Sequence, residues 1–140
     1  MTADPDLLRW LPHRAPMLLL ESVREADAQG GTALVRVDPG AGYADPSGAM
    51  PAWFGLELMA QTIAACRGRQ AGPGGAVQGG YLVAVRSFAS TVAAFAPGAL
   101  LEVRVRLQLE DPCGLCGFLG EIVQGGQVVV TGTLRVMEHT

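Results

Sequence analysis

The stretch that most constrains the fold covers residues 50–69, MPAWFGLELMAQTIAACRGR. Up to Cys66, its only clearly polar side chains are those of Glu57, Gln61 and Thr62. A proline near the start, where its missing N–H would lack a partner anyway, and the Leu, Met, Ala and Gln that follow favour a helix of about 15–20 residues. Because this helix is apolar almost all round, we expect it to be buried inside a domain. Its Glu, Gln and Arg residues argue against a membrane span.

The rest of the chain carries the patterns of strands and turns. The clearest strand is Leu100–Glu110, where Leu and Val alternate with Glu, Arg and Gln, so that one face is buried and the other is wet. Further strands are predicted at 17–23, 32–37, 81–87, 115–123 and 128–137, with a short helical turn at 4–10. Glycine pairs at 30–31 and 125–126 predict hairpin turns, and 38–48 and 72–80 read as loops.

Two strands, one apolar helix and four more strands have one economical arrangement. An antiparallel sheet with one apolar face buries that face and the helix together by curling around the helix. We therefore predict an α+β fold of the hot-dog type, in which the sheet wraps around one long buried helix. Residues 1–140 form a single domain in this prediction, and their 49% hydrophobic content is sufficient for a core of that kind.

Composition argues against several classes of function. The net charge of -3 does not suit a nucleic-acid surface. The first ten residues lack the basic start and apolar run of a signal peptide, and three cysteines, an odd number, fit a reducing compartment. We therefore expect a cytoplasmic protein with no nucleic-acid or membrane partner.

Glu57 is the one ionisable group in the middle of the apolar helix. Trp53 precedes it by one turn and Gln61 follows it by one turn, on the same face. Glutamate is rarely buried without a partner, and carboxyl groups in such surroundings cluster at functional sites. Two interpretations stay open: Glu57 is catalytic, or it fixes the packing through a hydrogen bond to the backbone.

Three segments resemble the FabZ-type 3-hydroxyacyl-carrier-protein dehydratases. They are Leu-Pro-His-Arg-Ala-Pro-Met-Leu-Leu-Leu from residue 11, Gly-Leu-Glu-Leu-Met-Ala-Gln from residue 55 and Ala-Pro-Gly-Ala-Leu-Leu-Glu-Val-Arg-Val from residue 96. The likeness covers most of the chain and is greatest for the ApeP-like branch, associated with aryl polyene biosynthesis. It implies dehydration of a 3-hydroxyacyl thioester on an acyl carrier protein to the trans-2-enoyl thioester, without a cofactor or a metal. It also implies a homodimer or higher oligomer, with a heterodimer with a second dehydratase as the alternative.

The chain departs from this family in the loop before the helix. FabZ enzymes place a catalytic histidine there in Gly-His-Phe-Pro, where this chain reads Gly-Tyr-Ala-Asp-Pro from residue 42. Its two histidines are His13, in a segment stiffened by prolines, and His139, beside the C-terminus. His13 is therefore the candidate imidazole, either as a replacement for the missing histidine or as a structural residue of its own motif.

The resemblance also implies roles for individual residues. Glu57 would be the acid or base, His13 its partner, and Gln61 would orient Glu57 or a water molecule. A backbone N–H near the helix N-terminus would stabilise the charge that develops on the thioester oxygen. The candidate substrate-binding residues are Met50, Trp53, Phe54, Gly55 and Gly80.

Two other functions remain open. Hot-dog thioesterases often activate water with one helix carboxylate and need no histidine, which matches the loop of this chain. A non-catalytic hot-dog subunit would keep the acyl tunnel and stabilise a catalytic dehydratase partner. Separately, Cys113 and Cys116 form a CxxC pair, which supplies half of a zinc site or simply packs at the start of a strand.

Overall fold

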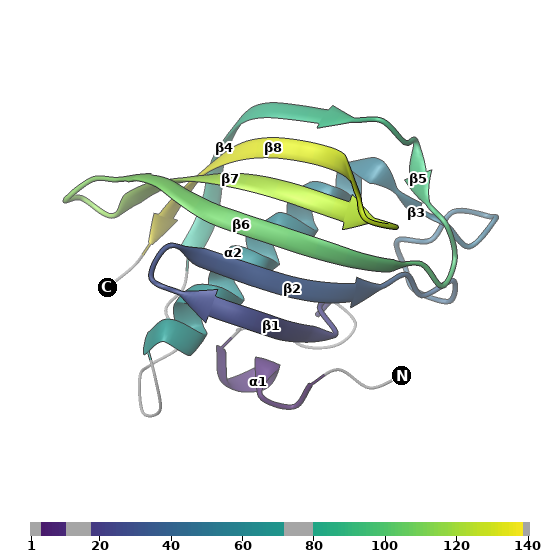
Figure 1. Cartoon of the computed structure of the whole chain (residues 1–140), viewed down its shortest axis with the longest axis horizontal. Helices are drawn as coiled ribbons and strands as arrows, with labels where there is room; N and C mark the ends of the chain where they lie inside the picture. Colours follow the sequence, from purple (N-terminus) through teal and green to yellow (C-terminus); the bar gives the residue numbers. More distant parts are fainter. Residues whose placement is uncertain (1–3, 11–17, 72–79, 139–140) are drawn as a thin grey trace.

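The computed structural model describes residues 4–10, 18–71 and 80–138, and it shows an antiparallel sheet curled around one helix (Figure 1). The six strands of the sheet follow the order β1-β2-β6-β7-β8-β4. They are β1 (Ser22–Asp27), β2 (Gly30–Arg36), β4 (Gly80–Ser90), β6 (Leu100–Glu110), β7 (Leu115–Gln124) and β8 (Gln127–Glu138). The short strands β3 (Met50–Pro51) and β5 (Ala94–Phe95) pair separately. The helices are α1 (Leu7–Trp10), the 3-10 turn η1 (Ala52–Phe54) and the central α2 (Gly55–Ala71).

The central helix differs from its predicted start, whereas its end and its length agree with the sequence. Pro51 has an extended backbone with ψ of 140° and closes β3, so helical backbone begins one residue later. Of the two glycines expected to end the helix, Gly68 lies inside α2, and the helix ends at Ala71, the residue before Gly72 in the sequence. A glycine inside a helix costs about 1 kcal/mol relative to alanine, which packing of the surrounding turns can offset. No helix among the described residues is both long and apolar enough to cross a membrane.

The first hairpin corrects a prediction about its glycines. Gly30 and Gly31 lie at the start of β2, and the turn occupies residues 28–29 instead. A Cβ on Gly31 would overlap the carbonyl oxygen of Glu25 on β1 and lie 2.6 Å from the Sγ of Cys66 on α2. These glycines are therefore needed for close packing inside the sheet, and the sequence pattern alone mistakes them for a turn.

The strands of the second half follow their sequence patterns closely. β6 matches its predicted range at both ends, and the alternating residues Leu101, Val103 and Val105 are buried as expected. The predicted inward face fails toward the end of the strand, where Leu107 is half-buried and Leu109 is exposed. Gly125 and Gly126 form the predicted turn between β7 and β8 with φ of 59° and 80°. Two positive φ values in a two-residue hairpin turn explain why both positions are glycine.

The helix approaches the concave face of the sheet at positions that lack side chains. Met59 is fully buried over Gly120 and Gly132, which pair across β7 and β8. A Cβ on Gly120 would lie 2.5 Å from the Sδ of Met59, so the glycines form a notch that the methionine fills. Gly55 makes the same kind of approach at the helix start, where a Cβ would lie 2.9 Å from Cδ1 of Ile122.

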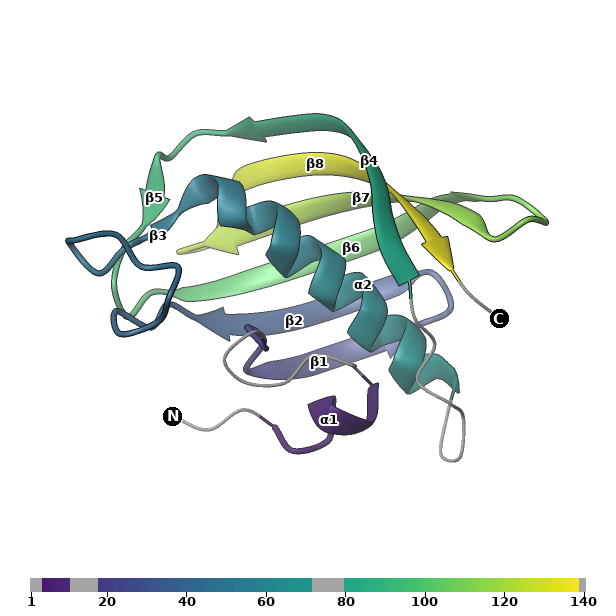
Figure 2. The ribbon, with the colours of Figure 1, turned by 180° about the vertical axis from the view of Figure 1, so that it is seen from behind.

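One side of α2 faces away from the sheet, and Figure 2 shows it in front of the strands. No strand among the described elements covers this side, hereafter the uncovered side of α2, and α1 contacts the helix. Leu56, Ala60 and Ala64 are half-exposed there, and Trp53 in the preceding turn is 62% exposed. The buried central helix of the prediction is confirmed, and within the described residues this side of it is less buried than the side that faces the sheet. No described strand pairs with the outer edge of β4, the last strand of the sheet.

Replacing Gly31 with alanine should strongly destabilise the fold. The new Cβ would meet the backbone of β1, which cannot move aside as a flexible side chain can. We expect a loss of about 3 kcal/mol in the free energy of unfolding, measured by denaturant titration. The matched control is Gly42→Ala, because Gly42 has open space around it and should change stability by less than about 0.5 kcal/mol. Equal stability of the two variants would contradict the close approach of Gly31 to the backbone of β1.

Candidate active site

Glu57 lies in the first turn of α2, on the half-exposed side of the helix. A carboxylate in this position is stabilised by the partial positive charge at the helix N-terminus. Its Oε1 accepts a hydrogen bond of 3.0 Å from Nε2 of Gln61, one turn later. Glu57 and Gln61, whose spacing of four residues predicts that they share one helix face, are thus in contact in the structure.

Gln61 is fully buried and connects the helix to a distant part of the chain. Its Oε1 accepts a hydrogen bond of 2.9 Å from the backbone N–H of Leu19. A backbone N–H can only donate, so the amide oxygen of Gln61 must face Leu19 and its NH2 group must face Glu57. Oε1 of Glu57 is therefore an acceptor, and a buried side chain fixes the direction of the carboxyl group.

His13, the predicted second catalytic group, lies in residues 11–17, outside the described residues. His139 also lies outside them. The described chain resumes with Leu18, directly before the residue whose N–H contacts Gln61. The position of an imidazole at this site therefore stays a prediction.

The loop before the helix contributes Tyr43, which sequence reasoning did not include among the site residues. Its hydroxyl oxygen accepts a hydrogen bond of 2.8 Å from the N–H of Asp38, and its ring centroid lies 5.5 Å from that of Phe54. Burial raises the pKa of the Tyr43 hydroxyl above its ordinary value, although the hydrogen bond from Asp38 offsets part of the rise. The hydroxyl therefore stays protonated at neutral pH. The signal that would have found it is its place directly after Gly42, where the family carries its histidine.

An open cavity of about 680 Å³ lies between this loop and the segment 18–21. Its size falls within the usual range of small-molecule sites, about 300–1,000 Å³. Tyr43 lines one wall and Leu19 lines another. Neither Glu57 nor Gln61 lines this cavity, and its connection to them runs through Leu19, whose N–H donates to Gln61.

The predicted substrate-binding residues have different surroundings. Met50 is fully buried in the core, and Gly55 is packed against the sheet. Phe54 is half-buried, and the exposed Trp53 stacks on it with ring centroids 4.3 Å apart. Gly80 is the first residue of β4, which is the edge strand of the sheet next to β8. The aromatic pair before the helix is thus the part of this set that is open to a ligand or a partner.

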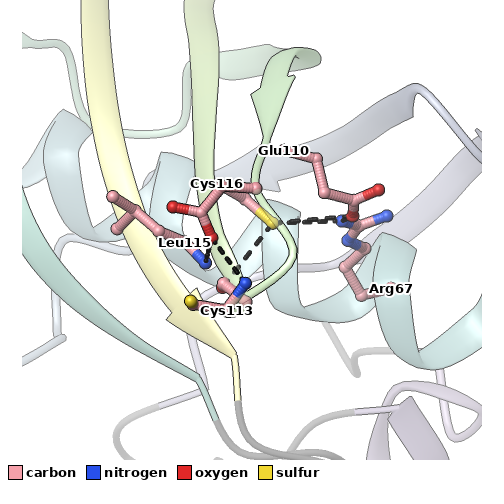
Figure 3. A network of polar contacts seen from close by, with 7 residues as sticks. Arg67, Glu110, Cys113, Leu115 and Cys116 are labelled. Atoms are coloured by element: carbon pink, nitrogen blue, oxygen red, sulfur yellow. Dashed lines mark hydrogen bonds and ion pairs between the residues drawn. The ribbon is translucent and has the colours of Figure 1, made fainter.

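The CxxC pair lies at the turn between β6 and β7, and its two side chains have different environments (Figure 3). Cys113 is exposed, whereas Cys116 is buried with its Sγ 3.4 Å from Nη2 of Arg67. The carboxylate of Glu110 accepts hydrogen bonds from Arg67 at 2.7 Å and from Cys116 at 3.7 Å. This cluster connects the C-terminal half of α2 to the β6–β7 turn. Within the described ranges, no three His, Cys, Asp or Glu residues are grouped so as to hold a metal.

A sheet curled around one helix, with a carboxyl group in the first turn of that helix, defines a protein of the hot-dog class. The chain belongs to the ApeP-like family, because the family model described as ApeP dehydratase matches residues 5–140. The resemblance found in the sequence is therefore confirmed. The chain is also similar to the dehydratase heterocomplex ApeI:P from Xenorhabdus doucetiae, with 31% identity and a TM-score of 0.83 over 96% of this chain and 91% of that chain.

More distant structures share the fold alone. A variant of the phenylacetic acid degradation protein PaaI from Thermus thermophilus has 20% identity and a TM-score of 0.60, covering 81% of this chain and 89% of that chain. A variant of the fluoroacetyl-CoA-specific thioesterase FlK has 16% identity and a TM-score of 0.60, covering 83% of this chain and 90% of that chain. No curated protein matches the sequence.

Gln61→Leu should destabilise the protein because it leaves the N–H of Leu19 without its acceptor. An unpaired buried donor costs about 1–3 kcal/mol, and we expect a loss of that size in the free energy of unfolding. Gln70→Leu is the matched control, since Gln70 lies on the same helix but is exposed. If denaturant titration gives the same stability for both variants, the bridge contributes nothing to the fold.

The thiols should differ in reactivity. Burial raises the pKa of Cys66 to about 12, so only about 10⁻⁴ of this thiol is ionised at pH 8. We expect iodoacetamide at pH 8 to alkylate the exposed Cys113 and to reach Cys66 only after denaturant is added, as followed by peptide mass spectrometry. Similar alkylation rates for Cys66 and Cys113 in the folded protein would disprove the burial of Cys66.

Proposed function

We propose that this chain is a catalytic subunit of a dehydratase that acts on 3-hydroxyacyl thioesters carried by an acyl carrier protein. Its product would be the trans-2-enoyl thioester of fatty acid or aryl polyene type biosynthesis. Membership of the ApeP-like family supports the dehydratase chemistry. The observation that assigns it to a residue is the orientation of Glu57 by the buried Gln61.

The reaction needs one proton acceptor and one proton donor. A base removes the proton from C2, the electron pair forms an enolate and then expels the C3 hydroxyl, and an acid protonates this hydroxyl as water leaves. The hydrogen bond from Nε2 of Gln61 to Oε1 of Glu57 orients the carboxyl group for one of these two proton transfers. His13 is the proposed second group if no partner subunit supplies a histidine to the site. Positioned acid and base groups contribute about 10²–10⁴-fold each, so a fast enzyme needs both.

The proposed assembly is a hetero-oligomer with a second hot-dog dehydratase subunit. A heterocomplex is the described state of the similar Xenorhabdus doucetiae structure. The uncovered side of α2 and the free edge of β4 give such a subunit two surfaces to bind, among the described residues. A partner that carries the loop histidine would bring an imidazole toward the half-exposed Glu57. A homodimer that uses His13 is the alternative assembly. Since the cysteines are free thiols, the cytoplasm is the expected location.

Glu57→Gln should abolish most of the activity while preserving the fold. The assay is hydration of an enoyl thioester on an acyl carrier protein, with the chain alone and mixed with a subunit that bears a Gly-His-Phe-Pro loop. We expect a fall of about 100-fold or more, because the amide cannot exchange the proton. Glu121→Gln, on the outward face of β7, should keep the full rate.

Each other outcome favours a different function. A folded Glu57→Gln variant with full hydratase activity would remove Glu57 from the mechanism. Release of free acid from the acyl thioester without turnover of the enoyl substrate would identify a thioesterase. Inactivity of the chain in both assays, with increased stability of the added subunit, would identify a non-catalytic partner.

A further inference from the structure

We propose that Tyr43 is a further catalytic residue, whose hydroxyl donates a hydrogen bond to the carbonyl oxygen of the bound acyl thioester. This inference rests on the proposed function, because it assigns a donor for the same reaction. Three observations support it: the place of the phenol in the loop, the hydrogen bond that its hydroxyl accepts from Asp38, and the cavity that Tyr43 and Leu19 both line.

The phenol ring is held in a fixed position relative to the start of α2. Tyr43 packs on Phe54 with an angle of 53° between the rings, and Phe54 belongs to η1, which leads directly into the helix. Glu57 follows Phe54 by about one turn, so the loop and the acid share one rigid support. Tyr43 also stands where the Gly-His-Phe-Pro loop of the resembling family has its imidazole.

The hydroxyl of Tyr43 can donate a hydrogen bond to a ligand. Its oxygen accepts the N–H of Asp38, which fixes the position of the oxygen, and a phenol has one proton to donate in addition. None of the described residues accepts that proton. Because burial favours the neutral phenol, the group acts as a hydrogen-bond donor and not as a base.

Two of the backbone amides near the helix start are already engaged. The N–H of Ala52 donates to the carbonyl oxygen of Ala93 at 3.0 Å, and the N–H of Gly55 donates within the η1 turn. A side-chain donor beside the helix start would therefore supplement the remaining amides at the thioester oxygen. The cavity gives the substrate access to it, since Tyr43 and Leu19 line the same space.

The role in the reaction requires no transfer of the phenolic proton. When the base removes the C2 proton, negative charge develops on the thioester oxygen, and the phenol stabilises it through the hydrogen bond. The charge leaves that oxygen again when the C3–O bond breaks and water departs. Loss of one such donor in an enzyme site typically lowers the rate about 10²–10³-fold.

The direct test is Tyr43→Phe, which removes the hydroxyl and keeps the ring that packs on Phe54. In the enoyl thioester hydration assay, we expect kcat to fall about 100-fold, with a much smaller change in KM, because the bond strengthens as charge develops. The control Thr133→Val removes a hydroxyl that bonds Ser87 on the exposed face and should keep the full rate.

A second measurement does not depend on turnover. The probe is an acyl pantetheine amide, a non-reacting analogue of the thioester, labelled with ¹³C at its acyl carbonyl. Its carbonyl resonance should move downfield on binding to the wild-type chain and to Thr133→Val, and the shift should be lost with Tyr43→Phe. Full activity of Tyr43→Phe with an unchanged carbonyl shift would overturn the role of Tyr43 alone. A shift that depends on Tyr43 without any dehydratase activity would overturn the proposed function and keep the binding role. Absence of both turnover and probe binding would overturn both.

Discussion

The structure depends on how closely an apolar helix can approach the sheet that encloses it. Side chains on both surfaces would keep the helix and the strands apart, so the strands carry glycine where the helix passes. Met59 fills the notch over Gly120 and Gly132, and the Sγ of Cys66 packs beside Gly31. The apolar area buried by these contacts stabilises the fold by about 25 cal/mol per Å². This close fit opposes sliding and rotation of the helix, because either movement would bring Met59 or Cys66 against strand backbone.

The position of Glu57 is a consequence of that fixed helix. Gln61 is fully buried, and its amide uses its oxygen toward Leu19 and its NH2 group toward the carboxyl. If either partner moved away, a buried polar atom would lose its hydrogen bond, at about 1–3 kcal/mol. The carboxyl group therefore has its direction before any substrate arrives. Preorganisation of this kind is the usual way in which a protein raises the rate of a proton transfer.

The elements that depend on local patterns could be predicted from the sequence. The alternation in 100–110 gave the limits of β6, and the spacing of Glu57 and Gln61 placed them on one helix face. Contacts that involve the backbone of a distant segment could not be predicted, because the N–H of Leu19 has no signature in the sequence. The glycines of the first hairpin resemble a turn in the sequence, because glycine is used both where the backbone needs conformational freedom and where there is no room for a side chain. Tyr43 has no signature of its own, because the family pattern places an imidazole at that position.

The uncovered side of α2 shows why assembly and chemistry belong together. An apolar segment in a sequence does not reveal whether the chain's own sheet or a second subunit buries it, and here the sheet covers one side. The exposed Trp53 and the half-exposed Glu57 lie at the same end of this uncovered side. A subunit that covers the tryptophan would also exclude water from the carboxyl group. Hydrogen bonds and charges act more strongly in such a water-poor site, so the same contact that completes the hydrophobic surface would strengthen the catalytic groups.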